Sequence, residues 1–244
     1  MTTSSRKPCV VCWSEATAPA DVYPADINTA VADGLKLALP DWEVVVAGLD
    51  DPEQGIPADL LKRCDVLVWW GHKRHGAVDD SRVEQIVQRV TREGMGFVSL
   101  HSAHFAKANI ALMSQSPTDA ALLNVVRPQG RVAAWGAYVG DSLDLTIQST
   151  CPEHPIAAGV PKTFKIVHHE RYSDPYAVPP AEAVVFEGDA VLKDGKIDHS
   201  TIGLCWTIGR GRMFYFQAGH ETNPVFFDPN VRTIVANAVR WAKA

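Results

Sequence analysis

The sequence predicts an α/β fold in which a mostly parallel sheet is covered by helices on both faces. Short apolar runs occur at Cys9–Trp13, Trp42–Ala47, Asp65–Trp70 and Gly96–Leu100, and helical segments alternate with them. This alternation is typical of parallel strands joined by crossover helices. Runs of this kind also favour strands that are buried on both faces.

A helix is predicted directly after the third apolar run. The four residues from Ser81 to Glu84 have the form of a capping box, which starts helices, and Gly94 can close the helix. The apolar positions between them fall on one helical face: Val83, Ile86, Val87 and Val90. A second helix is expected from about His104 to Met113.

The middle of the chain predicts an antiparallel extension of the sheet. Residues 114–161 are rich in Pro, Gly and Ser and hold one strand-like run, Leu143–Gln148. Further runs follow at Ala183–Glu187, Val191–Leu192 and Thr201–Thr207, with a turn at Lys193–Lys196. We expect these strands to be antiparallel.

The chain ends with a strand, a loop and a helix. A Gly-Arg-Gly-Arg turn leads into Met213–Gln217, and Asp228-Pro229 starts a helix with Val231, Ile234, Val235 and Ala238 on one face. No linker or repeat is apparent, so residues 1–244 are expected to form a single domain.

Composition excludes several classes of partner. The 244 residues carry a net charge of −5, with 46% hydrophobic and 21% charged residues, so there is no basic footprint for nucleic acid or an anionic membrane. A small neutral or polar ligand fits better. No apolar stretch reaches the roughly 18 residues of a membrane span, and no signal-type segment is seen. A cytoplasmic protein is expected.

The cysteines do not predict a metal or redox centre. Only Cys9 and Cys12 of the five are close in sequence. Along a strand their side chains point to opposite faces, which favours ordinary thiols over a redox or zinc pair.

Five histidines predict a functional site. His72, His75, His101, His104 and His220 follow three separate strand-like runs, and the carboxyl ends of parallel strands converge on one crevice. An imidazole has a pKa of about 6.5, so it can transfer protons at cellular pH. Its neutral form also binds zinc. Both uses remain open.

Other residues could join this site. Ser102 lies at a strand-to-helix turn, where His220 with Glu170 or Glu221 would complete an acyl-transfer triad, although it lacks the G-x-S-x-G frame and could merely cap a helix. A strand period would place His168, Glu170 and Tyr172 on one face, whereas the alternative is a solvated strand edge. His154 is interpreted as a turn residue.

Several motifs resemble those of the trehalose-utilisation, or ThuA-like, family: DVLVWWGHKRH, EGMGFVSLHSAHF, HPI, FYFQAGHET and IVANAVRWA. The resemblance runs from about Asp65 to the C-terminus. It implies the flavodoxin-like three-layer fold of the class I glutamine amidotransferases. His101 stands where their nucleophilic cysteine would fall, so amidotransfer is not expected. The resemblance also implies which side chains line the pocket: His72, His75, His101, Ser102, His104, Glu170, Tyr172, His220 and Glu221.

The resemblance also implies a sugar substrate, such as a disaccharide or its 3-keto derivative. The hypothesis is proton abstraction next to a carbonyl, with isomerisation or elimination, assisted by zinc or another divalent metal. No nucleotide cofactor is expected. His101 and His220 would face the reacting centre, with Glu170 as base or ligand. His72 and His104 would be metal ligands or oxyanion donors. Sugar rings would contact His75, Tyr172, Trp70 and Glu221, with Trp69 and Trp135 as further stacking surfaces.

Two alternatives remain open: a non-catalytic sugar-binding or regulatory protein, and a Ser102 hydrolase. The chain departs from the family pattern in residues 114–136, which leaves the identity of the sugar open. A homo-oligomer is also consistent with the sequence, because the seven tryptophans suggest aromatic surface.

Overall fold

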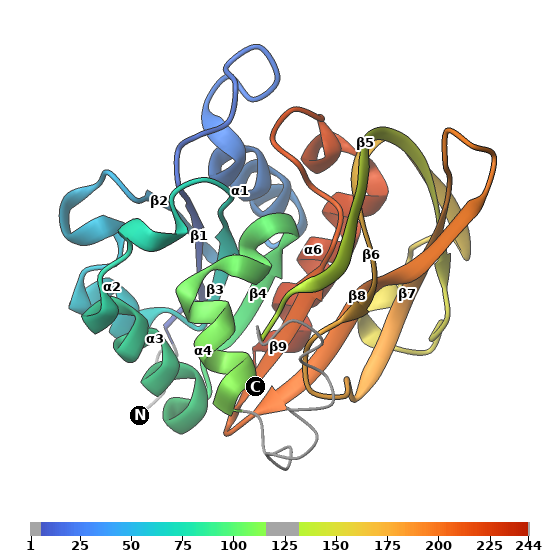
Figure 1. Ribbon diagram of the computed structural model, residues 1–244. Coiled ribbons are helices and arrows are strands. Elements are labelled where there is room, and N and C mark those ends of the chain that lie inside the picture. The colour runs from blue at the N-terminus through green and yellow to red at the C-terminus, as the bar shows by residue number, and fades with distance from the viewer. Residues whose placement is uncertain (1–5, 116–131, 244) are drawn as a thin grey trace.

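One nine-stranded sheet forms the centre of the molecule (Figure 1), with the strand order β2-β1-β3-β4-β9-β8-β7-β5-β6. The computed structural model describes residues 6–115 and 132–243. The predicted α/β class is confirmed.

The first half of the sheet is parallel. Its strands are β2 (Glu43–Gly48), β1 (Cys9–Ser14), β3 (Val66–Trp70), β4 (Gly96–Leu100) and β9 (Gly211–Phe216). Every residue of β1, β3 and β4 is buried, as expected for strands covered on both faces. The order β2-β1-β3-β4-β9 is that of a flavodoxin-type doubly wound sheet, whose ligands bind outside the carboxyl ends of the strands.

Helices cover both faces of this parallel half, as predicted (Figure 1). On one face α1 (Asp26–Ala38) and α6 (Pro229–Ala242) pack against Val10 and Val68. On the other face lie α2 (Ala58–Arg63), α3 (Asp80–Glu93) and α4 (Lys107–Gln115), which pack against Val11 and Leu67. Cys9 and Cys12 fall in opposite cores, and all five cysteines are free.

The second half of the sheet is antiparallel, with four strands that are longer than the five parallel ones. It comprises β5 (Trp135–Ser149), β6 (Thr163–Tyr176), β7 (Ala183–Val191) and β8 (Ile197–Ile208). The predicted antiparallel extension is present, but the prediction of a mostly parallel sheet is not confirmed, because the sheet is mixed. The sequence pattern indicated only Leu143–Gln148 in a region where β5 and β6 run for 15 and 14 residues.

Helix boundaries differ from the predictions at two places. Helix α3 begins at Asp80, and its N-cap Asp79 makes no side-chain capping bond, so the capping box at Ser81 is wrong; Gly94 ends the helix in the left-handed conformation, as predicted. The helix predicted from about His104 to Met113 is present as α4 but begins only at Lys107, because a 3-10 turn, His101–Phe105, precedes it.

The C-terminal helix agrees with the sequence analysis. The side chain of Asp228 accepts hydrogen bonds from the backbone N–H groups of Asn230 and Val231, and the four predicted apolar positions are buried. His154 caps the 3-10 turn Pro155–Ala157, which confirms its assignment as a turn residue. The other 3-10 turns are Pro52–Gly55, His75–Ala77 and Val225–Phe227. Among the described residues, none of the helices has the length and hydropathy to cross a membrane.

Close packing of β4 against α6 supports the strand that ends at the site. A Cβ atom added to Gly96 would lie 2.6 Å from the carbonyl oxygen of Ala242. Gly96→Ala should therefore destabilise the fold by about 1–3 kcal/mol through overpacking. Gly76→Ala is the control, because nothing lies within 4 Å of its added Cβ. Chemical denaturation measures both, and equal stabilities would contradict this packing account.

Candidate functional site

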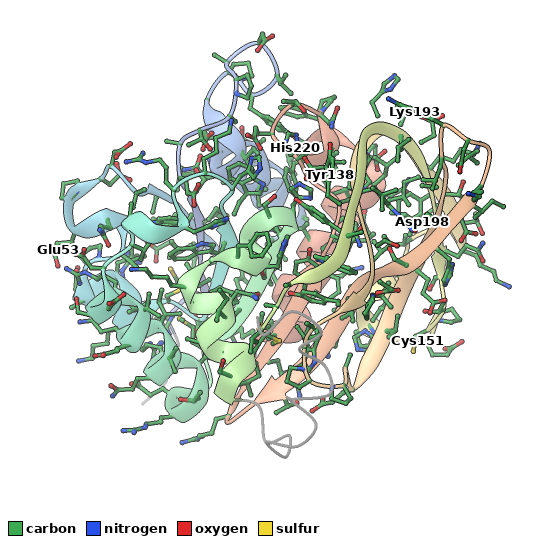
Figure 2. All side chains as sticks on the ribbon, in the orientation of Figure 1. Glu53, Tyr138, Cys151, Lys193, Asp198 and His220 are labelled. Atoms are coloured by element: carbon green, nitrogen blue, oxygen red, sulfur yellow. The ribbon has the colours of Figure 1, made fainter. Side chains whose placement is uncertain are left out.

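Ionisable side chains from four segments meet at the carboxyl end of the parallel strands. Glu15 directly follows β1, His72 lies after β3, His101 follows β4, and His220 lies after β9. Glu170 reaches the same place from the antiparallel strand β6. Figure 2 places His220 at this end of the molecule. The predicted convergence of the loop histidines thus includes His72, His101 and His220.

Glu170 lies between two imidazoles. Its Oε1 is 3.6 Å from Nε2 of His101, and its Oε2 is 2.8 Å from Nε2 of His220. All three side chains are buried, with at most 7% of each residue exposed. Burial alone raises the pKa of Glu170, but the adjacent imidazoles of His101 and His220 outweigh it and hold this pKa well below its usual range. Glu170 is therefore a carboxylate at neutral pH.

His101 is held in one orientation by the backbone. Its φ of 52° places it in the left-handed region, at the sharp turn from β4 into the 3-10 turn. Its Nδ1 donates a hydrogen bond of 2.6 Å to the carbonyl of Gln217. Since a carbonyl can only accept, Nδ1 carries the hydrogen, and Nε2 is the atom that faces Glu170.

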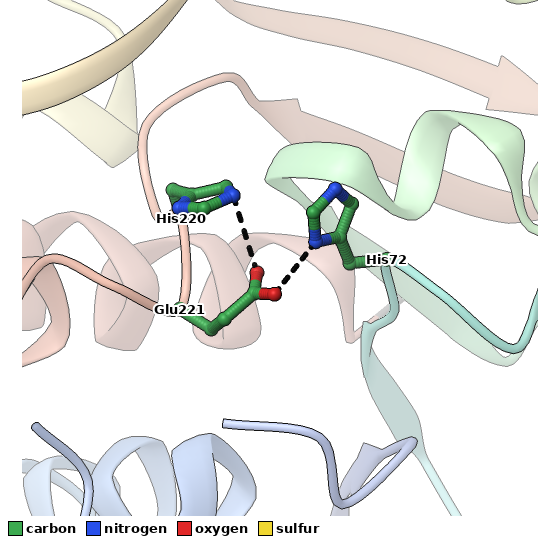
Figure 3. Close-up of side chains that lie close together, drawn as sticks. All are labelled: His72, His220 and Glu221. Atoms are coloured by element: carbon green, nitrogen blue, oxygen red, sulfur yellow. Dashed lines mark hydrogen bonds and ion pairs between the residues drawn. The ribbon is translucent and has the colours of Figure 1, made fainter. Parts of the chain in front are cut away.

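His72 and Glu221 form a second imidazole–carboxylate pair (Figure 3). Nδ1 of His72 donates to Oε1 of Glu221 at 2.7 Å, and Nζ of Lys73 lies 2.7 Å from the same oxygen. Oε2 of Glu221 is 3.4 Å from Nε2 of His220, so the two pairs adjoin. Burial raises the pKa of Glu221, but His72 and Lys73 lower it to about 2.

Glu15 is a site residue that the sequence analysis missed. It is fully buried, and its Oε2 accepts hydrogen bonds from the backbone N–H groups of His72, Lys73 and Arg74 at 2.7–2.9 Å. Its Oε1 lies 3.2 Å from Nδ1 of His75. Glu15 therefore fixes the loop that presents His72. Its position directly after β1, at the predicted carboxyl edge, was the signal that could have revealed it.

Ser102 and Tyr172 lie beside the centre but do not form a nucleophile–base pair. Both are buried, and Oγ of Ser102 is 3.0 Å from the hydroxyl of Tyr172. The ring of Tyr172 lies 5.3 Å from that of His101. The hydroxyl of Ser102 thus pairs with a phenol, whose pKa is raised by burial and by Glu170, and not with an imidazole base.

His104 points away from the charged centre. Its Nδ1 donates to the carbonyl of His101 at 3.0 Å, and its ring is enclosed by Phe105, Tyr172 and Tyr215. Burial lowers its pKa to about 3, so it stays neutral. The 3-10 turn, which stands in place of the first residues of the predicted helix, directs this side chain into the aromatic core. The structure therefore does not pair His104 with His72 as metal ligands.

The tryptophans expected to stack on sugar are buried. Trp69 and Trp70 are each 1% exposed and Trp135 is 6% exposed. Nε1 of Trp70 instead donates a hydrogen bond to the carbonyl of Gly219, directly before His220. This indole therefore holds the backbone of the loop that carries His220. The predicted stacking role of these three rings is wrong. Trp13 and Trp206 are also buried, so of the seven tryptophans only Trp42 and Trp241 are partly exposed. The expected homo-oligomer stays a prediction.

The strand period does not hold through His168. This residue has a φ of 52° and is exposed, whereas His169, Glu170, Arg171 and Tyr172 are all buried. The register of β5 with β6 shifts at several points here, and the irregularity breaks the alternation of faces. His168 therefore does not share a face with Glu170, and the alternative of a solvated edge is also wrong for Glu170.

Two sets of side chains among the described residues have the geometry of metal ligands. One is His101, Glu170 and His220, and the other is His72, His220 and Glu221. In each set the potential ligand atoms lie within 4.8 Å of one another. His75 belongs to neither set, and its expected contact with substrate stays a prediction.

The fold and the site together define an α/β protein of the doubly wound class, with an imidazole–carboxylate centre at the carboxyl ends of its parallel strands. A family model described as trehalose utilisation, ThuA, matches residues 20–242. The chain belongs to the ThuA family. The divergent segment 114–136 falls mainly on residues 116–131, which lie outside the described residues.

Solved structures share this fold. A ThuA-like protein from Bacteroides uniformis is 16% identical, with a TM-score of 0.63 over 99% of this chain and 94% of its own. One from Parabacteroides merdae is 14% identical, with a TM-score of 0.64 over 98% and 91%. A cytoplasmic protein from Salmonella typhimurium is 12% identical, with a TM-score of 0.62 over 96% and 98%. Comparison with curated proteins gave no match.

Loss of the Glu15 charge should loosen the loop from His72 to His75. Hydrogen bonds to a charged group contribute about 1.5–3 kcal/mol, so Glu15→Gln should lower the free energy of unfolding by a similar amount. Contacts with His75 and with the backbone N–H groups of His72 and Arg74 outweigh burial and lower the pKa of Glu15.

The sign of the pH dependence follows from that lowered pKa. The stabilisation is present above the unfolded pKa of about 4.3 and is lost as the pH falls through the lower folded pKa. The difference in stability between wild type and Glu15→Gln should therefore shrink in acid. Urea unfolding at a series of pH values measures it, and a difference that grows in acid would contradict the assignment.

Proposed function

We propose that this protein is an enzyme of carbohydrate catabolism that moves a proton next to the carbonyl of an oxidised sugar, such as a 3-keto derivative of trehalose or another disaccharide. The family assignment supports the sugar class. The observation that carries the proposal is the His72–Glu221 pair next to the buried Glu170.

The geometry suits His72 for the role of general base. Glu221 holds Nδ1 and its hydrogen at 2.7 Å, so proton transfer falls to Nε2. The side chain of His72 is 28% exposed, whereas that of Glu221 is fully buried. A substrate can therefore reach the imidazole, while the carboxylate that orients it stays protected from water.

Proton abstraction also needs a group at the carbonyl oxygen of the substrate. A carbonyl acidifies the neighbouring C–H bond, and a group that polarises the carbonyl oxygen stabilises the negative charge that develops there. His101, Glu170 and His220 lie deeper than His72. Because Glu170 is negatively charged, these three residues suit that role by holding a cation against the carbonyl oxygen, not by contacting the oxygen themselves. This division differs from the sequence-based hypothesis, which placed His101 and His220 at the proton transfer and His72 at the oxygen.

The two alternative functions are less well supported. A Ser102 hydrolase needs a base at the hydroxyl, and that hydroxyl pairs with Tyr172 instead. A non-catalytic sugar-binding protein needs no buried carboxylates, which are costly unless they are paired. Three of them, Glu15, Glu170 and Glu221, are buried at this site.

Proton exchange in heavy water tests the proposal directly. A 3-keto disaccharide incubated with the protein should exchange the hydrogens next to its carbonyl for deuterium, or form an isomerised or eliminated product, as followed by NMR. His72→Ala should slow this reaction by about 10²- to 10⁴-fold, the usual contribution of a general base.

His199→Ala is the matched control, because His199 is an exposed histidine that also lies 2.7 Å from a carboxylate, that of Asp189, but outside the site. It should react like wild type. Sugar binding in calorimetry without exchange or product would favour the binding protein and overturn the proposal. Labelling of Ser102 by a fluorophosphonate would favour the hydrolase.

A further inference from the structure

The centre holds more buried negative charge than its cations neutralise. Glu221 has Lys73 as an ion-pair partner, and Glu15 has three backbone N–H groups. Within the described part of the chain, in contrast, Glu170 forms ion pairs only with the imidazoles of His101 and His220. A buried carboxylate is costly unless positive charge compensates it.

Two electron-rich atoms face each other at the floor of the centre. The hydrogen of His101 is on Nδ1, which donates to Gln217, so the neutral ring presents a bare Nε2. That atom is fully buried, has no hydrogen-bond partner among the described residues, and lies 3.6 Å from Oε1 of Glu170. A cation between the two atoms satisfies both, and unsatisfied buried groups of this kind call for an ion or a water.

His220 completes a set of two imidazoles and one carboxylate. Its Nε2 lies 2.8 Å from Oε2 of Glu170 and its Nδ1 lies 2.7 Å from Oγ1 of Thr222. Ligand atoms around a tetrahedral zinc, at about 2.0–2.1 Å from the ion, are separated by about 3.3 Å. The separations of 3.6 Å from His101 to Oε1 of Glu170 and of 2.8 Å from His220 to Oε2 bracket this value, and the potential ligand atoms of the three residues lie within 4.8 Å of one another. Ion binding therefore requires the side chains to adjust so that one carboxylate oxygen and both nitrogens face the ion.

We propose that His101 Nε2, His220 Nε2 and the carboxylate of Glu170 bind one divalent transition-metal ion of the zinc type, with a further position open for the oxygen of a substrate. On binding, the ion takes the place of the hydrogen on Nε2 of His220. That hydrogen moves to Nδ1, where Oγ1 of Thr222 accepts it, and the 3.3 Å hydrogen bond from the backbone N–H of Thr222 to Nδ1 is given up. Gln217 and Thr222 then orient the two imidazoles, as outer partners of metal-bound histidines usually do.

The second set of potential ligands is a poorer site. His72 and Glu221 share His220 Nε2 with the first set, so the two sets compete for one ion. Oε1 of Glu221 is already bonded to His72 and lies 2.7 Å from the ammonium group of Lys73. A dication there would meet a like charge, whereas no Lys or Arg forms an ion pair with Glu170 among the described residues.

This inference rests on the proposed function for its purpose, since a metal ion would polarise the substrate carbonyl while His72 removes the proton. Ion binding itself is measured without substrate, so the two proposals can fail separately. Bound zinc without proton exchange overturns the function alone. Undiminished exchange by protein freed of metal overturns the proposed role of the ion.

Metal binding should be measured on full-length protein made without a polyhistidine tag, stripped with a chelator and dialysed. Elemental analysis after zinc addition should give one ion per chain, and cobalt(II) should produce the visible absorption of a four-coordinate nitrogen and oxygen site. Glu170→Gln and His101→Ala should lose both signals. Thr222→Val, which removes an outer partner only, should weaken zinc binding by about 10- to 100-fold.

His199→Ala is again the control, because His199 lies 2.7 Å from Asp189 and 3.6 Å from Glu187 on the surface and could bind metal adventitiously. It should bind zinc like wild type. Circular dichroism shows whether each variant is folded. The cobalt spectrum of the wild-type protein tests the site even if a variant does not fold. Absence of zinc from wild type, or loss of binding in His72→Ala and Glu221→Gln with retention in Glu170→Gln, would overturn the assignment.

Discussion

The burial of three carboxylates at one edge of the sheet is the constraint on which the local structure depends. Glu15, Glu170 and Glu221 come from three distant parts of the chain and are at most 6% exposed. Each must be compensated by hydrogen bonds or positive charge. The loop after β3 donates backbone N–H groups to Glu15. The side chains of His72 and Lys73 pair with Glu221, and the imidazoles of His101 and His220 lie next to Glu170. The conformation of these loops therefore depends on the pairing of the buried charges.

The mixed sheet explains how these groups come together. The five parallel strands deliver Glu15, His72, His101 and His220 to their carboxyl edge, where a doubly wound sheet usually binds its ligand. The antiparallel half brings Glu170 and Tyr172 to the same place, since Nε2 of Gln217 and Oγ of Ser200 both bond to the carbonyl of Tyr172. The antiparallel extension is therefore part of the site.

Part of this site could be predicted from the sequence. Apolar runs followed by histidines fix which residues leave the carboxyl ends of parallel strands, and this placed His72, His101 and His220 together. Glu15 was missed because one acidic residue after a strand forms no motif. The position of Glu170 depends on irregular pairing of β5 with β6, and that of His104 on a 3-10 turn, neither of which follows from side-chain periodicity. Trp70 was misassigned because sequence alone does not reveal burial.

The most direct test of the account is a crystal structure of the zinc-soaked protein, with diffraction recorded on both sides of the zinc absorption edge. The account predicts one anomalous peak at about 2.0–2.1 Å from Nε2 of His101 and Nε2 of His220, with an oxygen of Glu170 as the third ligand. A peak between His72 and Glu221, or no peak at this edge of the sheet, would contradict it.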